Sequence, residues 1–135
     1  MPRTLIAEIV TPERIVYTNE VEMVVAPTID GEIGVLPLHA PLVGALGAGE
    51  VRIKYGDTTE WFAVSGGYIQ VHEDKVIILA DDAEAASQID VDRARQAKVL
   101  AEQQLADLGG TGEEADVFEH DLRWAEARIA VGSGH

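Results

Sequence analysis

Few side chains of this 135-residue sequence have the types and the spacing that a chemical reaction requires. The clearest group is the segment DDAE, residues 81–84, which carries three carboxylates within four positions. Carboxylates grouped in this way can hold Mg²⁺ or act as general acid and base. The same group is also typical of a solvated linker, and we favour that interpretation because it follows directly on a predicted strand.

The other groups that carry out catalysis are absent or isolated. The sequence has no cysteine, no serine-nucleophile elbow and no glycine-rich phosphate loop. None of the histidines stands at a spacing that is typical of metal ligands, and we interpret them as surface residues. They are His39, His72, His120 and His135. We therefore expect a protein that is not an enzyme and has no metal site.

The arginines near the C-terminus are better candidates for a binding site. Arg93 and Arg95 fall in the first turns of a predicted helix, where the helix dipole disfavours cations. Such arginines call for an anionic partner, either a carboxylate or a phosphate. Asp90 and Asp92 would provide an ordinary local ion pair, and this alternative stays open. Arg128 stands alone among apolar residues of a second predicted helix, where it can face the same region.

Residues 3 to about 83 have the pattern of short strands. In EVRIKY, residues 50–55, apolar and charged side chains alternate with a period of two. Other short segments are rich in β-branched and aromatic residues, namely LIAEIV, RIVY, VEMVV, EWFAVS, GYIQV and KVIILA. Turn-forming residues separate these segments, which indicates a sandwich or a barrel. We predict an antiparallel β-sandwich over residues 1–86.

A helical period of three and four residues replaces this pattern, and we predict a two-helix antiparallel hairpin over residues 87–135. Asp90 is the expected N-cap of the first helix, and Ser87 with Asp90 resembles a capping box one turn earlier. Gly109 and Gly110 end that helix, and Thr111 is the expected cap of the next one. The predicted fold class is therefore α+β.

The seam of the predicted hairpin is poor in large side chains. The first helix offers its partner Ala94, Ala97, Ala101, Leu105 and Leu108. Burial energy grows with apolar area, so a seam made mainly of alanines leaves the hairpin marginal unless it docks elsewhere. A weakly docked hairpin can be moved by a ligand, and a permanently docked one is the alternative.

The net charge of −14 excludes binding to nucleic acid through phosphate neutralisation. No apolar stretch approaches the ~20 residues of a membrane span. The N-terminal segment MPRTLIAEIV is a poor signal peptide, because Glu8 interrupts its short apolar run. We therefore expect a cytoplasmic protein that inserts into no membrane itself and reaches one only through another protein.

Four segments in register resemble the epsilon subunit of bacterial F-type ATP synthases, a family that includes chloroplast epsilon and mitochondrial delta subunits. They are GEIGVLPLHAPLV (31–43), VSGGYIQV (64–71), KVIILADDAE (75–84) and IDVDRA (89–94). The resemblance implies a non-catalytic rotor subunit of the central stalk, peripheral to the cytoplasmic face of the bacterial plasma membrane. It implies contacts with the gamma subunit and the c-subunit ring. The matching contact residues are Gly31, Glu32, His39, Pro41 and Leu42.

The resemblance also implies a regulatory hairpin. In an extended form the hairpin of relatives reaches the alpha/beta catalytic head and inhibits ATP hydrolysis, whereas in a folded-back form some members bind ATP. The matching positions for ATP are Glu84, Ile89, Asp90, Arg93, Ala94 and Arg128. Two arginines of ATP-binding relatives are replaced here by Leu100 and Trp124, which weakens the expectation of ATP as a regulatory ligand. No cofactor is required, and a nucleotide-sensing module is the alternative function.

Overall fold

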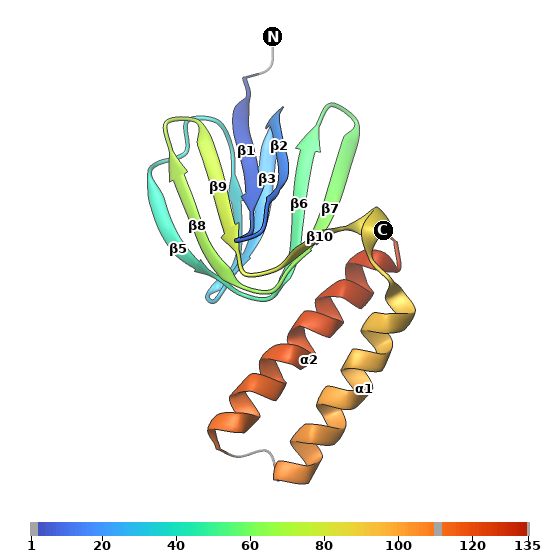
Figure 1. Cartoon of the computed structure of the whole chain (residues 1–135). Coiled ribbons are helices and arrows are strands. Elements are labelled where there is room, and N and C mark those ends of the chain that lie inside the picture. Colours follow the sequence, from blue (N-terminus) through green and yellow to red (C-terminus); the bar gives the residue numbers. More distant parts are fainter. Residues whose placement is uncertain (1–2, 110–111, 135) are drawn as a thin grey trace.

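The computed structural model describes residues 3–109 and 112–134 as a strand-rich body followed by two helices (Figure 1). The strands are β1 (Leu5–Val10), β2 (Ile15–Val21), β3 (Met23–Thr28), β4 (Gly31–Val35), β5 (Leu42–Leu46), β6 (Gly49–Tyr55), β7 (Thr58–Val64), β8 (Gly67–His72), β9 (Lys75–Ala80) and β10 (Ala83–Ala85). A short 3-10 helix (Ala86–Gln88) leads into α1 (Val91–Leu108) and α2 (Glu113–Gly132). The predicted order of a β-sandwich and then a helical hairpin is confirmed.

The strands pair in the order β10-β7-β6-β3-β5-β8-β9-β1-β2, with β4 paired to β3. Among the described residues these pairs are antiparallel, except that β1 and β9 are parallel. The predicted antiparallel sandwich therefore holds with one exception. Strand β1 lies between its antiparallel hairpin partner β2 and the parallel strand β9.

The inward faces of the strands build one apolar core. Alternate residues point inward as the period of two predicts, and Val51 and Ile53 of β6 are fully buried. At one side of the core the ring of Tyr17 meets that of Phe62 edge-on, with 5.1 Å between the ring centres. Burial raises the pKa of the Tyr17 phenol to about 12, and the neighbouring Glu60 carboxylate acts in the same direction.

Local capping signals place the helix ends. The Asp90 carboxylate accepts a hydrogen bond from the backbone N–H of Arg93 at 3.0 Å, which confirms the predicted cap of α1. Gly109 ends α1 in the left-handed conformation, also as predicted. The capping box predicted at Ser87 is wrong, because that residue lies in the 3-10 helix, whose N-cap is Ala85. Helix α2 begins after Gly112, and the predicted cap Thr111 lies outside the described residues, as does Gly110.

The hairpin is docked on one end of the sandwich (Figure 1). Its internal seam is made of small residues, with Ala94 and Ala101 of α1 buried against α2. The contact with the sandwich is a second small apolar cluster, in which Ala127 and Val131 of α2 meet Ala63 of β7. The remaining members of this cluster are only partly buried, and they are Trp61, Ala86, Ile89 and Trp124. The contact between hairpin and sandwich is thus built from a few side chains, of which only Ala63, Ala127 and Val131 are buried.

Candidate functional site

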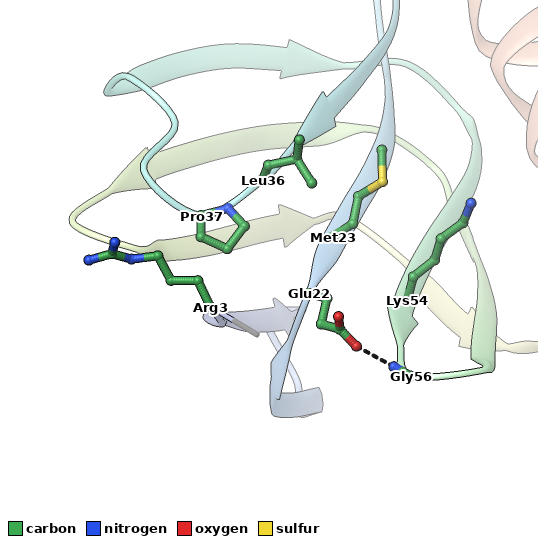
Figure 2. Close-up of a pocket in the computed structure, with 7 residues that line it drawn as sticks. All are labelled: Arg3, Glu22, Met23, Leu36, Pro37, Lys54 and Gly56. Carbon is green, nitrogen blue, oxygen red and sulfur yellow. Dashed lines mark hydrogen bonds between the residues drawn. The ribbon is translucent and has the colours of Figure 1, made fainter. Parts of the chain in front are cut away.

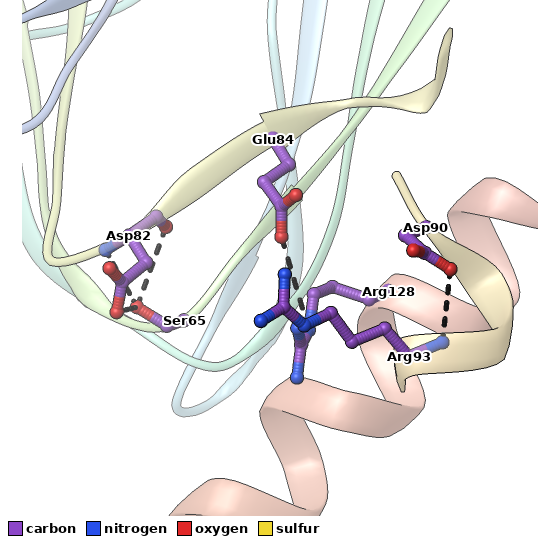
Figure 3. Close-up of polar contacts among 6 residues, drawn as sticks. All are labelled: Ser65, Asp82, Glu84, Asp90, Arg93 and Arg128. Atoms are coloured by element: carbon purple, nitrogen blue, oxygen red, sulfur yellow. Dashed lines mark hydrogen bonds and ion pairs between the residues drawn. The ribbon is translucent and has the colours of Figure 1, made fainter. Parts of the chain in front are cut away.

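An ion pair joins the hairpin to the end of the sandwich. Arg128 of α2 places its Nε 4.0 Å from Oε1 of Glu84, which lies on β10 (Figure 3). The Arg128 side chain is only 17% exposed, and its guanidinium stands 5.0 Å from the centre of the Trp124 ring. No other described residue hydrogen-bonds to the buried Nε of Arg128. The guanidinium is therefore held by charge and by the aromatic face, with donor capacity left unused.

The remaining residues of the predicted nucleotide site lie around the start of α1. The Asp90 carboxylate accepts its hydrogen bond from the backbone N–H of Arg93. Ile89 packs into the small apolar cluster, and Ala94 is fully buried. The Arg93 side chain is directed toward the Glu84–Arg128 pair in Figure 3. Among the described residues Arg93 makes no ion pair, whereas Arg95 makes one with Asp92 at 3.6 Å. The local ion-pair alternative therefore applies to Arg95 and not to Arg93.

The two positions that depart from ATP-binding relatives have different surroundings. Leu100 is 55% exposed and lies beside Val99 on the surface of α1. Trp124 is half-buried and borders a hollow of about 260 Å³ between the sandwich and α2. The polar residues that line this hollow are Thr11, Glu13, Arg14, Asp82 and Glu84. An aromatic ring thus borders this hollow together with Glu84, the ion-pair partner of Arg128.

The carboxylates of residues 81–84 serve different purposes. Asp82 accepts from the hydroxyl of Ser65 at 3.4 Å, and its backbone N–H donates to that hydroxyl at 2.8 Å (Figure 3). Glu84 pairs with Arg128. Within the described ranges no three histidine or acidic side chains lie close enough to hold a metal ion.

The residues predicted to contact the rotor fall into two groups at opposite ends of the sandwich. Gly31 and Glu32 begin β4 beside the end of β3, and Glu32 pairs with Arg52 at 3.4 Å. His39, Pro41 and Leu42 lie at the other end, after β4 and at the start of β5. The ring Nδ1 of His39 is 2.7 Å from its neighbouring backbone carbonyl, and its side chain makes no long-range bond among the described residues. The structure therefore brings three of these residues together and separates them from the other two.

The other histidines are exposed where they are described. His72 stands near Glu73 in the β8–β9 turn, at 3.7 Å. His120 of α2 lies close to the backbone turn at Gly66. His135 lies outside the described residues. These placements agree with surface histidines.

An exposed apolar face of the sandwich was not predicted from the sequence. On β5, β8, β9 and β1, Ala45, Tyr68, Leu79 and Val10 form one cross-strand row. Val43, in the next row, is 72% exposed. A signal was present in the sequence for three of these strands, because β5, β9 and β1 carry apolar residues on both alternating faces. Strand β8 adds only Tyr68, since Gln70 and His72 share its outward face. Exposed apolar patches of this kind mark contact surfaces.

No helix in the described part of the chain is both long enough and apolar enough to cross a bilayer.

Comparison with known proteins agrees with the resemblance drawn from the four sequence segments. The β-sandwich domain model of the ATP synthase delta/epsilon chain matches residues 4–86. The ATP synthase epsilon chain of Desulforamulus reducens is 47% identical over 122 residues, which cover 90% of each chain. The epsilon chain of Dehalococcoides mccartyi is 48% identical over 124 residues, 92% of this chain and 89% of that one.

Solved structures show the same fold. A chain of the Euglena gracilis mitochondrial ATP synthase, solved as OSCP/F1/c-ring, superposes with a TM-score of 0.80 at 24% identity. The superposition covers 96% of this chain and 82% of that chain. The sandwich, the docked hairpin and the matches to curated epsilon chains together show that the chain belongs to the ATP synthase delta/epsilon chain family.

Proposed function

We propose that the chain is a non-catalytic rotor subunit of the central stalk, coupling the gamma subunit to the c-subunit ring in ion-driven ATP synthesis. In this role it lies at the cytoplasmic face of a bacterial plasma membrane, held there by its partners. The observation that carries the proposal is the exposed apolar face on β5, β8, β9 and β1. A sheet face backed by a close-packed core is a rigid surface, and rigidity suits a contact that transmits torque.

The apolar face is the proposed contact with gamma. Its rows run across four hydrogen-bonded strands, so the side chains of Val43, Tyr68 and Leu79 are fixed relative to one another. Two of these side chains are more than half exposed, an arrangement that favours burial by another protein. The end of the sandwich that carries Gly31 and Glu32 is the proposed contact with the c ring. The other predicted rotor residues, His39, Pro41 and Leu42, lie just before β5 or at its start, so we assign them to the gamma contact.

The test is binding of the purified chain to the gamma subunit of the same ATP synthase. Val43→Asp places a charge on β5, at one side of the apolar face, without touching the core, because Val43 points to solvent. We expect at least tenfold weaker binding to gamma, since a buried unpaired charge is costly. Thr59→Asp, on the exposed part of β7, is the matched control and should bind as the unaltered chain does. Equal binding by both variants would refute the proposed face.

A second candidate function is nucleotide sensing by the docked hairpin. It is favoured by the convergence of Glu84, Arg128 and Arg93, since an arginine without an ion-pair partner is available to a phosphate. Leu100 and Trp124 argue for weak binding, because each replaces a charge-assisted contact of relatives. Titration of the isolated chain with ATP, with and without magnesium, would show saturable amide shifts near Arg93 and Arg128 at millimolar nucleotide. No shifts at that concentration would exclude the sensor.

Inhibition of ATP hydrolysis through the alpha/beta head is the third part of the proposal. It requires the hairpin to leave the sandwich, and the small apolar cluster at Ala63, Ala127 and Val131 makes that separation accessible. An assembled ATP synthase that carries the chain without residues 87–135 should hydrolyse ATP faster than the complete complex. An unchanged rate would show that this hairpin does not inhibit.

A further inference from the structure

Arg52 lies on the outward face of β6, between a proposed rotor residue and the contact that holds the hairpin. Its Nη2 is 3.4 Å from Oε1 of Glu32, which lies on β4. The central carbon of its guanidinium is 5.6 Å from the centre of the Trp61 ring on β7. Strand β3 separates β6 from β4, so the side chain reaches across β3 to Glu32 while it stands over Trp61.

The register of the strands explains how Arg52 is held. It is the direct cross-strand neighbour of Trp61 on β7 and of Val25 on β3, and neighbours of this kind point to the same side of a sheet. Val24 and Ala26 belong to the core, so Val25 points outward, yet it is only 5% exposed. The aliphatic stem of Arg52 is placed to cover this valine, as long cationic side chains commonly do. Arg52 is therefore packed along its length.

Trp61 belongs to the contact between the hairpin and the sandwich. Its ring packs against the small apolar cluster in which only Ala63, Ala127 and Val131 are buried. An indole ring brings far more apolar area to such a contact than an alanine does. The ring thus has Arg52 as one neighbour and the hairpin contact as another. A change in the place of Arg52 therefore alters the surface on which the hairpin docks.

The place of Arg52 depends in turn on Glu32. The Arg52 side chain is 31% exposed, and no described residue hydrogen-bonds to its buried Nε. A partly buried guanidinium that loses a carboxylate is poorly compensated where it stands, and its flexible stem lets it turn toward water. The Glu32 side chain is 58% exposed, so another molecule can reach its carboxylate. Loss of the Glu32 contact therefore releases Arg52 from the Trp61 ring.

We infer that Arg52 is a positioning residue that links the c-ring contact at Glu32 to the docking of the hairpin, with Trp61 as the intermediate. The inference rests on the proposed contact of Glu32 with the c ring. A cationic side chain of the ring that takes the Glu32 carboxylate removes Arg52 from Trp61, and the hairpin then separates from the sandwich more readily. The chain on the ring has a lower docked fraction than the chain alone, because the ring favours the undocked form.

Lys54 provides a matched control on the same strand. It points to the same side of β6 as Arg52, and its cross-strand neighbours are Met23 and Thr59. With Met23 it borders a hollow of about 530 Å³ at the end of the sandwich that carries the β6–β7 turn (Figure 2). Lys54→Met therefore removes a cation from the same face while it leaves both neighbours of Arg52 in place.

The first measurement is the docked fraction of the isolated full chain. Cysteines introduced at the exposed Asp57 and Asp107 carry a donor and an acceptor dye, and energy transfer between them reports docking. Hydrogen exchange of the α2 amides reports the same equilibrium without dyes. The urea midpoint of each variant shows that the sandwich itself remains folded.

Arg52→Met should raise the undocked fraction about threefold or more, because it removes the guanidinium from both neighbours. Glu32→Gln should raise it about twofold. The double variant should equal Arg52→Met alone, since the effect of Glu32 passes through Arg52. Lys54→Met should leave docking unchanged, as should Asp30→Asn, which neutralises an exposed carboxylate in the turn before β4.

The second measurement adds the c ring. The complex of the chain with gamma is compared before and after addition of the purified ring in detergent. Energy transfer should fall for the unaltered chain and stay constant for Arg52→Met, which has already lost the link.

The outcomes separate this inference from the proposed function beneath it. Additive losses in the double variant would overturn the link within the chain, whatever the ring does. If Glu32→Gln weakens binding to the ring but the ring leaves energy transfer unchanged, the coupling is wrong although the ring contact is right. If Glu32→Gln binds the ring normally, the proposed ring contact is wrong, and a double variant equal to Arg52→Met would still support the link from Glu32 to the hairpin.

Discussion

The Glu84–Arg128 pair predicts how firmly the hairpin is held on the sandwich. Arg128→Met keeps the aliphatic stem but removes the guanidinium that faces both Glu84 and the Trp124 ring. At the 4.0 Å separation of Arg128 and Glu84 the gross attraction is about 4 kcal/mol for an effective dielectric of about 20. Desolvation and side-chain entropy offset most of this, leaving about 0.5–1 kcal/mol for a partly exposed pair. The contact with the Trp124 ring adds about 0.5–1 kcal/mol.

The expected loss of docking free energy is therefore about 1–2 kcal/mol, which is a roughly 5- to 30-fold rise in the undocked fraction. Glu84→Gln should lose only the ion-pair part, about 0.5–1 kcal/mol. In the double variant the two losses should not add, because both remove the same pair. The difference between the summed losses of the single variants and the loss in the double variant gives the free energy of the ion pair, separate from the contact with the Trp124 ring.

The absence of native cysteines makes the measurement direct. Cysteines introduced at Thr59 on β7 and at Asp107 near the end of α1 can carry a donor and an acceptor dye. Energy transfer then reports the docked fraction, and hydrogen exchange of the α2 amides reports the same equilibrium independently. Arg128→Met with energy transfer and exchange rates equal to those of the unaltered chain would refute the view that this pair secures docking.

Three further predictions concern stability, each measured by urea unfolding. Gly67→Ala should lower the free energy of unfolding by more than about 4 kcal/mol, because a Cβ would lie 2.0 Å from the carbonyl oxygen of Leu79 at a φ of +124°. Gly56→Ala, which has open space around it, is the control and should cost only about 1 kcal/mol. Equal costs for the two variants would contradict the steric argument. Gly132→Ala should destabilise the hairpin although alanine favours helices, because the new Cβ would lie 2.7 Å from a methyl group of Val91, and a stabilised variant would show that the helix ends can separate freely. The raised pKa of Tyr17 favours the neutral phenol in the folded state, so its contribution to the free energy of unfolding is complete below pH 10 and is lost as pH rises toward about 12. Tyr17→Phe should therefore flatten the fall in stability at alkaline pH. An unchanged fall would assign it to other groups.

The sequence predicted those features that depend on neighbours along the chain. The cap at Asp90 and the left-handed end at Gly109 use residues within one turn, so their types alone determine them. The alternation of apolar and charged residues in β6 likewise predicts which face of the strand is buried. The arginine and carboxylate positions of the candidate site came from the family resemblance, and the contact between Glu84 and Arg128 needed the three-dimensional structure.

The features that the sequence did not reveal depend on contacts between distant segments. The parallel pairing of β1 with β9 leaves no local mark, because both strands look like any other. Leu38 has a φ of +68° and donates its backbone N–H to the Asp74 carboxylate 36 positions away, a contact that the loop sequence does not predict. The separation of Glu32 from His39 likewise follows from the direction of β4, although both residues fall within one short motif.

The place of β1 between β2 and β9 has a consequence for how the chain is made. The ribosome releases β1 first, yet one of its two neighbours is complete only at Ala80. Until then β1 has only β2 beside it, and a two-stranded ribbon is marginal in water. A nascent chain must therefore carry an open strand edge through most of the synthesis of the sandwich, a state prone to aggregation. Closure of the sandwich is thus an event of late synthesis, and the strand made first is among the last to be fixed.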